Sequence, residues 1–251
     1  MALYARLKIM DWHAFLRDWS HASASRGFES EAFGEVGGFP LLASSKGDPS
    51  QPCIYLSTGI HGDEPSGPQA LFGLLNENFF DDRFHWLICP ALNPTGLEAG
   101  TRENFNGIDL NRDYCFGKSG EVSSHLAWLK KQEIPQLFLS LHEDWESSGV
   151  YYYEINLGGA VPDYKNLLAA AAPYFPPEPE SVIDNHEVTE PGWIHHSEHP
   201  DLPEGWPEAI YLAKMGCPVS LTFETPSSMP FQKRVDCHQA MVRESIRGCL
   251  L

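Results

Sequence analysis

Apolar and polar positions alternate with several different periods along the chain. Trp12, Phe15, Leu16 and Trp19 recur at helical spacing and predict a first helix over residues 10–22. Short apolar runs bounded by glycine, proline or polar residues are typical of strands, and the uninterrupted ones of strands buried on both faces of a sheet. We therefore expect several short strands within 33–47 and one strand in each of the ranges 52–59, 83–92, 136–142, 149–157 and 217–226.

Amphipathic segments separate these runs and predict helices. Ser66 begins the segment 66–79 and is a plausible N-cap, since its hydroxyl can accept from a free helical N–H group. The expected helices cover residues 66–79, 123–132, 208–216 and 231–250.

Alternating buried strands and helices predict an α/β fold. We expect a single domain over residues 1–251, with three layers (α/β/α) and a mixed, largely parallel central sheet. Ligands of such sheets bind outside the carboxyl ends of the strands. The segment at about 173–207 loses periodicity and is dense in proline, glutamate, histidine and tryptophan. It predicts a long loop excursion from the sheet rather than a separate domain.

Composition narrows the classes of function. Hydrophobic residues make up 42% of the 251 residues, which is enough for a sizeable core. The formal net charge of -17 repels phosphate backbones and anionic membrane surfaces. Nucleic-acid binding and membrane association are therefore not expected.

The 6 cysteines are scattered and form no CxxC pair, so neither a cysteine-rich metal site nor a disulfide framework is indicated. The first residues lack the apolar run of an export signal, and no stretch is long and apolar enough to span a bilayer. Together these features predict a cytoplasmic protein.

Candidate chemistry begins directly after the expected strand 52–59. His61 and Glu64 lie in a glycine-bearing turn, and His142 lies at the end of another expected strand. Two histidines and one carboxylate form a common ligand set of catalytic zinc. An ordinary polar turn is the alternative. Asp63 lies between two of these candidate ligands, and we expect it to shape the loop or to support them.

A second polar segment covers residues 93–114 and carries Arg102 and Arg112 among glycines and asparagines. Guanidinium groups bind carboxylates in a bidentate manner and stabilise developing oxyanions. The segment therefore suggests anion binding, with a solvated surface loop as the alternative.

Four segments in succession carry a family resemblance: "GIHGDEPSG", "NPTGLEAGTRENFNGIDLNRDY", "LSLHEDW" and "LTFETP". Their series resembles the zinc carboxypeptidase family, the carboxypeptidase A-like clan, and is most similar to compact bacterial members such as the murein peptide amidases. The TRxNxNGxDLNR pattern is its most specific part.

The resemblance implies a role for each matching residue. His61, Glu64 and His142 would hold one zinc ion. Arg102 would polarise the scissile carbonyl, and Glu224 would act as general base. The substrate's terminal carboxylate would be bound by Asn111 and Arg112.

The implied activity is a zinc-dependent exopeptidase that removes a C-terminal amino acid from a small peptide, which could be a cell-wall fragment. The alternative is an N-acyl amino acid hydrolase of the aspartoacylase or succinylglutamate desuccinylase type, whose substrate also carries a free carboxylate. A catalytically dead binding module is the third hypothesis.

The family resemblance leaves two features of the chain without an assignment. Larger members use a tyrosine upstream of the general base to cover the substrate, but Tyr211 lies in an expected helix, and the run 151–153 is more typical of a strand. The histidines His195, His196 and His199 lie near Glu198 in the 173–207 segment. A role in a specificity loop or on the surface is favoured for them over a second metal site.

Overall fold

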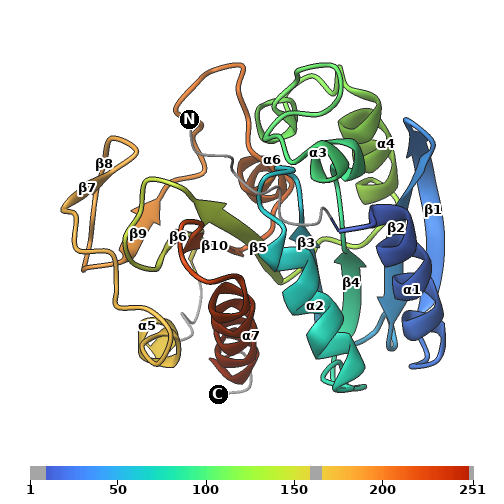
Figure 1. Cartoon of the computed structure of the whole chain (residues 1–251), viewed down its shortest axis with the longest axis horizontal. Coiled ribbons are helices and arrows are strands. Elements are labelled where there is room, and N and C mark those ends of the chain that lie inside the picture. Colours follow the sequence, from blue (N-terminus) through green and yellow to red (C-terminus); the bar gives the residue numbers. More distant parts are fainter. Residues whose placement is uncertain (1–9, 159–165, 249–251) are drawn as a thin grey trace, which may run out of the picture.

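Eight strands form one mixed sheet in the computed structural model, which describes residues 10–158 and 166–248 (Figure 1). Their order across the sheet is β1-β2-β4-β3-β5-β10-β6-β9. The four central strands β4, β3, β5 and β10 are parallel, whereas β1, β2 and β6 pair antiparallel with their inner neighbours. The strands are β1 (Glu29–Val36), β2 (Phe39–Lys46), β3 (Cys53–Thr58), β4 (His85–Cys89), β5 (Leu137–Asp144), β6 (Tyr151–Asn156), β9 (Trp193–His196) and β10 (Val219–Pro226).

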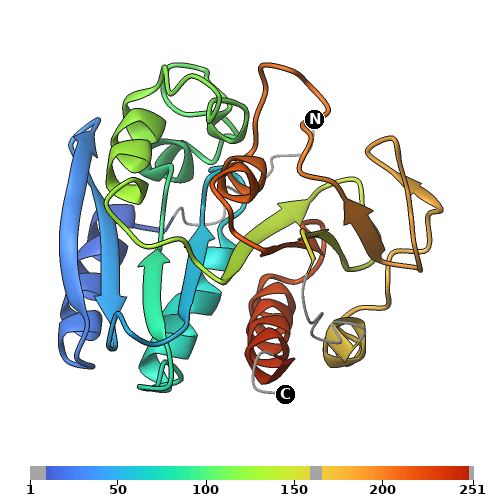
Figure 2. The ribbon, with the colours of Figure 1, turned by 180° about the vertical axis from the view of Figure 1, so that it is seen from behind.

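Helices cover both faces of this sheet, which confirms the expected three-layer α/β architecture with a mixed, largely parallel sheet. One face, in front in Figure 1, carries α1 (Trp12–Ala24), α2 (Ser66–Asn76), α5 (Asn166–Ala171) and α7 (Phe231–Gly248). The other face, in front in Figure 2, carries α4 (Gly120–Leu129) and α6 (Glu208–Lys214). The predicted end of the last helix, residues 249–250, lies outside the described residues.

The alternation of side chains along a strand creates a separate core on each face. In β3, Ile54 and Leu56 pack in the core under α1, α2 and α7. Tyr55 points the other way and packs with Phe138 and Trp128 under α4. Burying each large apolar side chain stabilises the fold by about 1.5–3 kcal/mol. A strand that is apolar on both faces is therefore held at the centre of the sheet.

The turn after β3 depends on close backbone approach. Gly59 has a φ of 62°, in the left-handed region that favours glycine. A Cβ on Gly62 would lie 1.9 Å from the carbonyl carbon of Gly96, in the short helix α3 (Pro94–Ala99). The backbone of the turn thus rests directly on the backbone of α3.

The start of α2 differs from the sequence-based expectation. Pro65, not Ser66, is the N-cap, and it makes no side-chain capping bond, so the predicted Ser66 cap is wrong. Ser66 N donates instead to Glu143 Oε1 at 2.7 Å, and Glu143 also pairs with Arg234 of α7. A carboxylate from β5 therefore satisfies the positive end of the helix dipole.

The segment 173–207 is not a pure loop. β7 (Val182–Ile183) and β8 (His186–Glu187) form a two-stranded hairpin, and β9 pairs parallel with β6 as the last strand of the sheet. The expectation that the whole segment leaves the sheet is wrong for Trp193–His196. This strand has four residues, two of them histidines, which is too short and too polar to show a strand period.

The opposite edge of the sheet is β1. Its exposed residues include Glu29, Glu31 and Glu35, and its register with β2 shifts between Ala32 and Gly34. Within the described ranges, no helix has the length and apolar character needed to cross a membrane.

Replacing Gly62 by alanine is expected to destabilise the protein. The new methyl group meets backbone rather than a flexible side chain, so the turn or α3 must move, at a cost of about 1–3 kcal/mol in the free energy of unfolding. Urea unfolding measures this difference. Gly120→Ala is the matched control, because its Cβ meets only a side-chain methyl of Val36 at 3.3 Å. Equal stability of the two variants would contradict the close approach.

Candidate metal centre

His61, Glu64 and His142 converge at the carboxyl ends of β3 and β5. One ligand atom of each lies within 4.8 Å of the others, and all three side chains are buried. His61 Nδ1 lies 2.6 Å from Glu64 Oε1, and His142 Nδ1 lies 2.9 Å from Glu64 Oε2. The two Nδ1 atoms are 3.3 Å apart. The structure thus brings together the three residues expected to bind metal.

The protonation of the three groups is mutually dependent. Burial alone would raise the pKa of Glu64, but His61 and His142 beside it lower that pKa below its usual range. Burial lowers the pKa of His142. Burial also acts to lower the pKa of His61, but the neighbouring Glu64 and Asp109 outweigh it and raise that pKa to about 9. Glu64 and Asp109 thus favour positive charge at His61, and a bound cation would compete with the proton there.

Asp109 lies behind the cluster. Its Oδ1 is 3.4 Å from His61 Nε2, a buried nitrogen with no other hydrogen-bond partner in the described structure. Asp109 Oδ2 accepts from Arg102 Nε at 3.1 Å, and Arg102 Nη1 lies 3.3 Å from His61 Nδ1. A carboxylate at the far nitrogen of a metal-ligating histidine fixes its ring and raises its basicity.

The donor set fits a divalent transition metal. Two imidazoles and one carboxylate form a catalytic zinc set that leaves a coordination position open. The Nδ1 atom of His61 faces the other two donors, while its Nε2 faces Asp109. Both the ligand types and the support of the histidine ring agree with a metal site.

Glu224 lies beside the cluster because of strand register. Its Cα pairs with that of His142 on one side and that of Tyr151 on the other, so the three side chains share one face of the sheet. Glu224 is half-buried. Burial, together with the negative charges of Glu64, Asp144 and Asp184, raises the pKa of Glu224 well above its usual range.

The loop that carries Arg102 is held in place by Asn104. Its Oδ1 accepts from Asn106 N and Ile108 N at 3.0 Å each, and its Nδ2 donates to both oxygens of buried Glu121 in α4. These four bonds hold the "NFNG" turn to the helix layer. They explain why a polar, glycine-bearing segment adopts one conformation.

Asn111 and Arg112 lie on the short turn that follows. Asn111 Oδ1 accepts from Glu208 N at 2.9 Å, so its amide nitrogen remains to donate to a ligand. The exposed Arg112 donates from Nη1 to its neighbour's carbonyl at 2.9 Å. In the part of the chain that the structure describes, no carboxylate lies within ion-pair distance of Arg112.

A buried polar network supports this turn from below. Glu208 accepts from Tyr55 Oη at 2.8 Å and from Ser57 Oγ at 2.7 Å. His125 joins Tyr55 Oη at 2.9 Å and Tyr114 Oη at 2.7 Å, and burial lowers its pKa to about 3, so its ring is neutral. Tyr114 then donates to Nδ1, and Nε2–H donates to Tyr55, which leaves the Tyr55 proton for Glu208.

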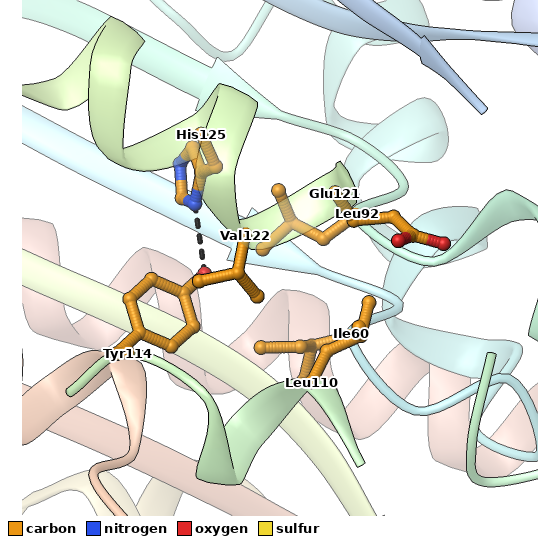
Figure 3. Close-up of a pocket in the computed structure, with 7 residues that line it drawn as sticks. All are labelled: Ile60, Leu92, Leu110, Tyr114, Glu121, Val122 and His125. Atoms are coloured by element: carbon orange, nitrogen blue, oxygen red, sulfur yellow. Dashed lines mark hydrogen bonds between the residues drawn. The ribbon is translucent and has the colours of Figure 1, made fainter. Parts of the chain in front are cut away.

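Figure 3 shows the space beside this network, where the Tyr114–His125 bond lies next to apolar side chains. The space is too tight to hold a ligand, so it serves as packing under the loop. Its lining residues are Ile60, Leu92, Leu110, Tyr114, Glu121, Val122 and His125.

The structure also places the residues to which the family resemblance assigns no role. Tyr211 lies in α6 with its ring 5.9 Å from that of Tyr114, and Tyr151 Oη donates to Asp144 Oδ2 at 3.1 Å. Asp63 is exposed. His195, His196 and His199 do not form one cluster, but His196 lies near two other potential ligands, His186 and Asp201.

Comparisons by sequence cover only part of the chain. Residues 50–153 match the succinylglutamate desuccinylase/aspartoacylase catalytic domain family. Carboxypeptidase SOL1 of Arabidopsis thaliana is 35% identical over an alignment of 95 residues, and the match covers 32% of this chain. The chain spans only 19% of the length of that relative.

Comparisons of structure cover nearly the whole chain. A candidate metallopeptidase from Shewanella denitrificans has a TM-score of 0.83 and 25% identity, with 95% of this chain and 90% of that chain covered. A metallo-carboxypeptidase from Burkholderia cenocepacia has a TM-score of 0.67 at 17% identity, covering 94% of this chain and 67% of that one. Carboxypeptidase A from Helicoverpa armigera has a TM-score of 0.64 at 14% identity, covering 94% and 71%.

The chain therefore has the zinc carboxypeptidase-like fold, as the sequence resemblance predicted. The comparisons support a hydrolase of the metallo-carboxypeptidase or succinylglutamate desuccinylase/aspartoacylase type. The special likeness to murein peptide amidases stays a prediction.

Glu208 is expected to make stability depend on pH. Burial raises its pKa to about 7, so between pH 4.5 and 7 the folded chain holds a proton that the unfolded chain has released. Stability should fall as the pH rises through this window, by up to about 3 kcal/mol. Urea unfolding at pH 5 and pH 8, at matched metal content, should show a loss of stability that is smaller by this amount in Glu208→Gln than in the wild type. The exposed Glu204→Gln is the control, and a wild-type slope in Glu208→Gln would contradict the assignment.

Proposed function

We propose that the protein is a zinc-dependent hydrolase that releases a C-terminal amino acid from a small peptide. The observation that carries this proposal is the placement of Glu224 beside His142 on one sheet face, next to a buried set of two histidines and one glutamate. A structural metal site needs no carboxylate beside it, whereas amide hydrolysis needs a proton acceptor at that point.

His61, Glu64 and His142 would hold one catalytic zinc ion. When bound, zinc supplies Lewis-acid chemistry: it lowers the pKa of water to about 7 and polarises a carbonyl oxygen. Asp109 would keep the His61 ring oriented toward the ion, since its carboxylate already faces His61 Nε2.

Glu224 would move the proton. As the water oxygen bonds to the scissile carbonyl carbon, Glu224 takes a proton from that water. It then gives the proton to the nitrogen as the C–N bond breaks, which yields a free amine and a carboxylic acid, and the acid loses its remaining proton to solvent. The raised pKa of Glu224 favours the proton-carrying form between these steps, and the charge of a bound cation would oppose that rise.

Two positively charged groups would bind the substrate. Arg102, next to His61, would stabilise the negative charge that develops on the carbonyl oxygen, a contribution of about 10²–10³ in rate. Asn111 and Arg112 would bind the free α-carboxylate, because their amide nitrogen and guanidinium remain available for it.

A second candidate function is hydrolysis of an N-acyl amino acid. It is favoured by the match of residues 50–153 to the succinylglutamate desuccinylase/aspartoacylase catalytic domain family. The two activities share the same ligands and a substrate carboxylate. They differ in the acyl group, for which the segment 173–207 beside β6 would provide the contacts.

We also propose a cytoplasmic setting, with cell-wall fragments as one class of peptide. Cys53, Cys89, Cys115, Cys217 and Cys237, the cysteines of the described ranges, are all free thiols, which suits a reducing compartment.

Amino acid release by the purified protein tests the function. The panel holds L-peptides, γ-D-glutamyl-diaminopimelate peptides and N-acyl amino acids, and mass spectrometry detects the products before and after chelation. We expect a C-terminal residue from one peptide class, with activity lost on chelation and restored by zinc. Cleavage of the N-acyl compounds alone would establish the second candidate instead. No turnover of any substrate by zinc-loaded protein would favour a binding module.

Replacing Glu224 by glutamine should reduce turnover by about 10²–10⁴-fold, because the proton acceptor is lost while the ligands remain. Zinc content, measured by elemental analysis, should stay at the wild-type level. Glu154→Gln is the matched control, since Glu154 is a buried glutamate of the neighbouring strand that faces the other side of the sheet. Unchanged turnover in Glu224→Gln would remove Glu224 from this role.

A further inference from the structure

A second group of potential metal ligands lies at the β9 edge of the sheet, in the segment 173–207. His186 Nε2 is 3.3 Å from Asp201 Oδ2, and His196 Nε2 is 3.4 Å from Asp201 Oδ1. One ligand atom of each lies within 4.8 Å of the others, and the two imidazole ring centroids are 4.7 Å apart. The aspartate thus lies between two histidines from different strands.

Local backbone structure places each of these side chains. Asp184 and Asn185 both have positive φ, 48° and 65°, which is the two-residue turn that joins β7 and β8 tightly. His186 is the first residue after that turn. His196 is the last residue of β9, and Asp201 follows five residues later.

The spacing of the donors fits tetrahedral coordination. Metal–ligand distances of about 2.0–2.1 Å at tetrahedral angles separate neighbouring donor atoms by about 3.3 Å. Each histidine lies at about this separation from one oxygen of Asp201: His186 Nε2 is 3.3 Å from Oδ2, and His196 Nε2 is 3.4 Å from Oδ1. A small movement of the exposed Asp201 would present a single oxygen to both histidines.

The orientation of His196 points to the same conclusion. Its Nδ1 lies 2.6 Å from the carbonyl oxygen of Ser197, so Nδ1 carries the hydrogen and donates it. Its Nε2 faces the Asp201 carboxylate, 3.4 Å from Oδ1. Metal-ligating histidines characteristically donate their other N–H to such a carbonyl.

We propose that His186, His196 and Asp201 bind a second divalent transition metal ion, of the zinc class. Two imidazoles and one carboxylate suit zinc and related ions rather than magnesium or calcium, which prefer oxygen ligands. Asp201 has a side chain 64% exposed, so water can reach the ion and complete its coordination. This site is separate from the one proposed for catalysis and does not depend on that function.

The ion would join three pieces of the segment 173–207: the β7–β8 hairpin, β9 and the turn that carries Asp201. The ring of Tyr153 contacts both histidines, at 5.8 Å and 6.2 Å between centroids, and its hydroxyl donates to Asp184 at 2.9 Å. Tyr153 lies two residues after Tyr151, which pairs with Glu224. The second ion would therefore stabilise the conformation of the segment 173–207, which lies beside the sheet face proposed for catalysis.

A third group, Cys53, His85 and Glu133, carries no such inference. His85 Nδ1 and Glu133 form a direct short hydrogen bond that accounts for their contact. Cys53 is buried in β3, and desolvation raises the pKa of its thiol far above the usual range, which disfavours the thiolate that binds metal.

Metal stoichiometry of the full chain tests the proposal. Chelator-stripped protein is equilibrated with zinc, separated from free metal by gel filtration and assayed by elemental analysis. We expect two zinc ions per chain in the wild type and one in His142→Ala, which lacks only the first site. We also expect one in the double variant His186→Ala, His196→Ala. His195→Ala, a change of the exposed neighbour on the same strand, should keep both.

Asp201→Asn removes a proposed ligand without disturbing the fold, because an exposed side chain contributes little to stability. It therefore distinguishes loss of the metal site from a folding defect in the histidine variants. It should weaken the second equivalent by at least about tenfold in a zinc titration while leaving the first unchanged. Zinc should also slow proteolysis within residues 182–201 in His142→Ala protein. A single ion in the wild type together with none in His142→Ala would overturn the second site. Loss of the second ion in His195→Ala would overturn its assignment to His186, His196 and Asp201.

Discussion

The parallel pairing of β5 with β10 is the constraint on which the candidate site depends. It sets His142 opposite Glu224, and the pairing of β10 with β6 then adds Tyr151 to the same face. Because side chains alternate along a strand, a slip of one residue would turn Glu224 into the core under α7 and bring Phe223 beside the metal ligands. The apolar residues that flank these positions, Leu141 and Phe223, are buried on the opposite face and oppose such a slip. The hydrophobic core thus fixes the distance between the ligands and the carboxylate.

Buried carboxylates connect that sheet to the loops around it through hydrogen bonds and ion pairs. Glu64 lies between two histidines, Glu143 holds the start of α2 and the Arg234 side chain, and Glu208 holds Asn111 through its backbone. Each of them would cost several kcal/mol if it were left ionised without a partner. A chain with a net charge of -17 therefore places these carboxylates where donors or positive charges already lie. Loop positions that a hydrophobic core alone would leave variable become fixed.

The sequence predicted the features that local pattern controls. Continuous apolar runs identified β3, β5 and β10, and the motifs around His61, Arg102 and His142 gave the residues that the structure brings together. The sequence could not show which segments distant in the chain contact one another. Asp109 lies within the quoted "GIDLNR" motif, but nothing local shows that it faces His61, 48 residues earlier in the numbering. The role of Glu208 depends on Tyr55 and Ser57 of β3, and β9 depends on pairing with β6 rather than on its own four residues.

The outer strand β1 has a consequence for self-association. An edge strand offers unpaired backbone groups to which a second chain could add a strand of its own. Here Glu29, Glu31 and Glu35 place like charges along that edge, and the irregular register near Ala32 bends it away from the flat geometry that strand addition requires. Two copies that met at β1 would bring these glutamates together. The eight-stranded sheet is thereby protected at this edge from continuing into a fibrous aggregate.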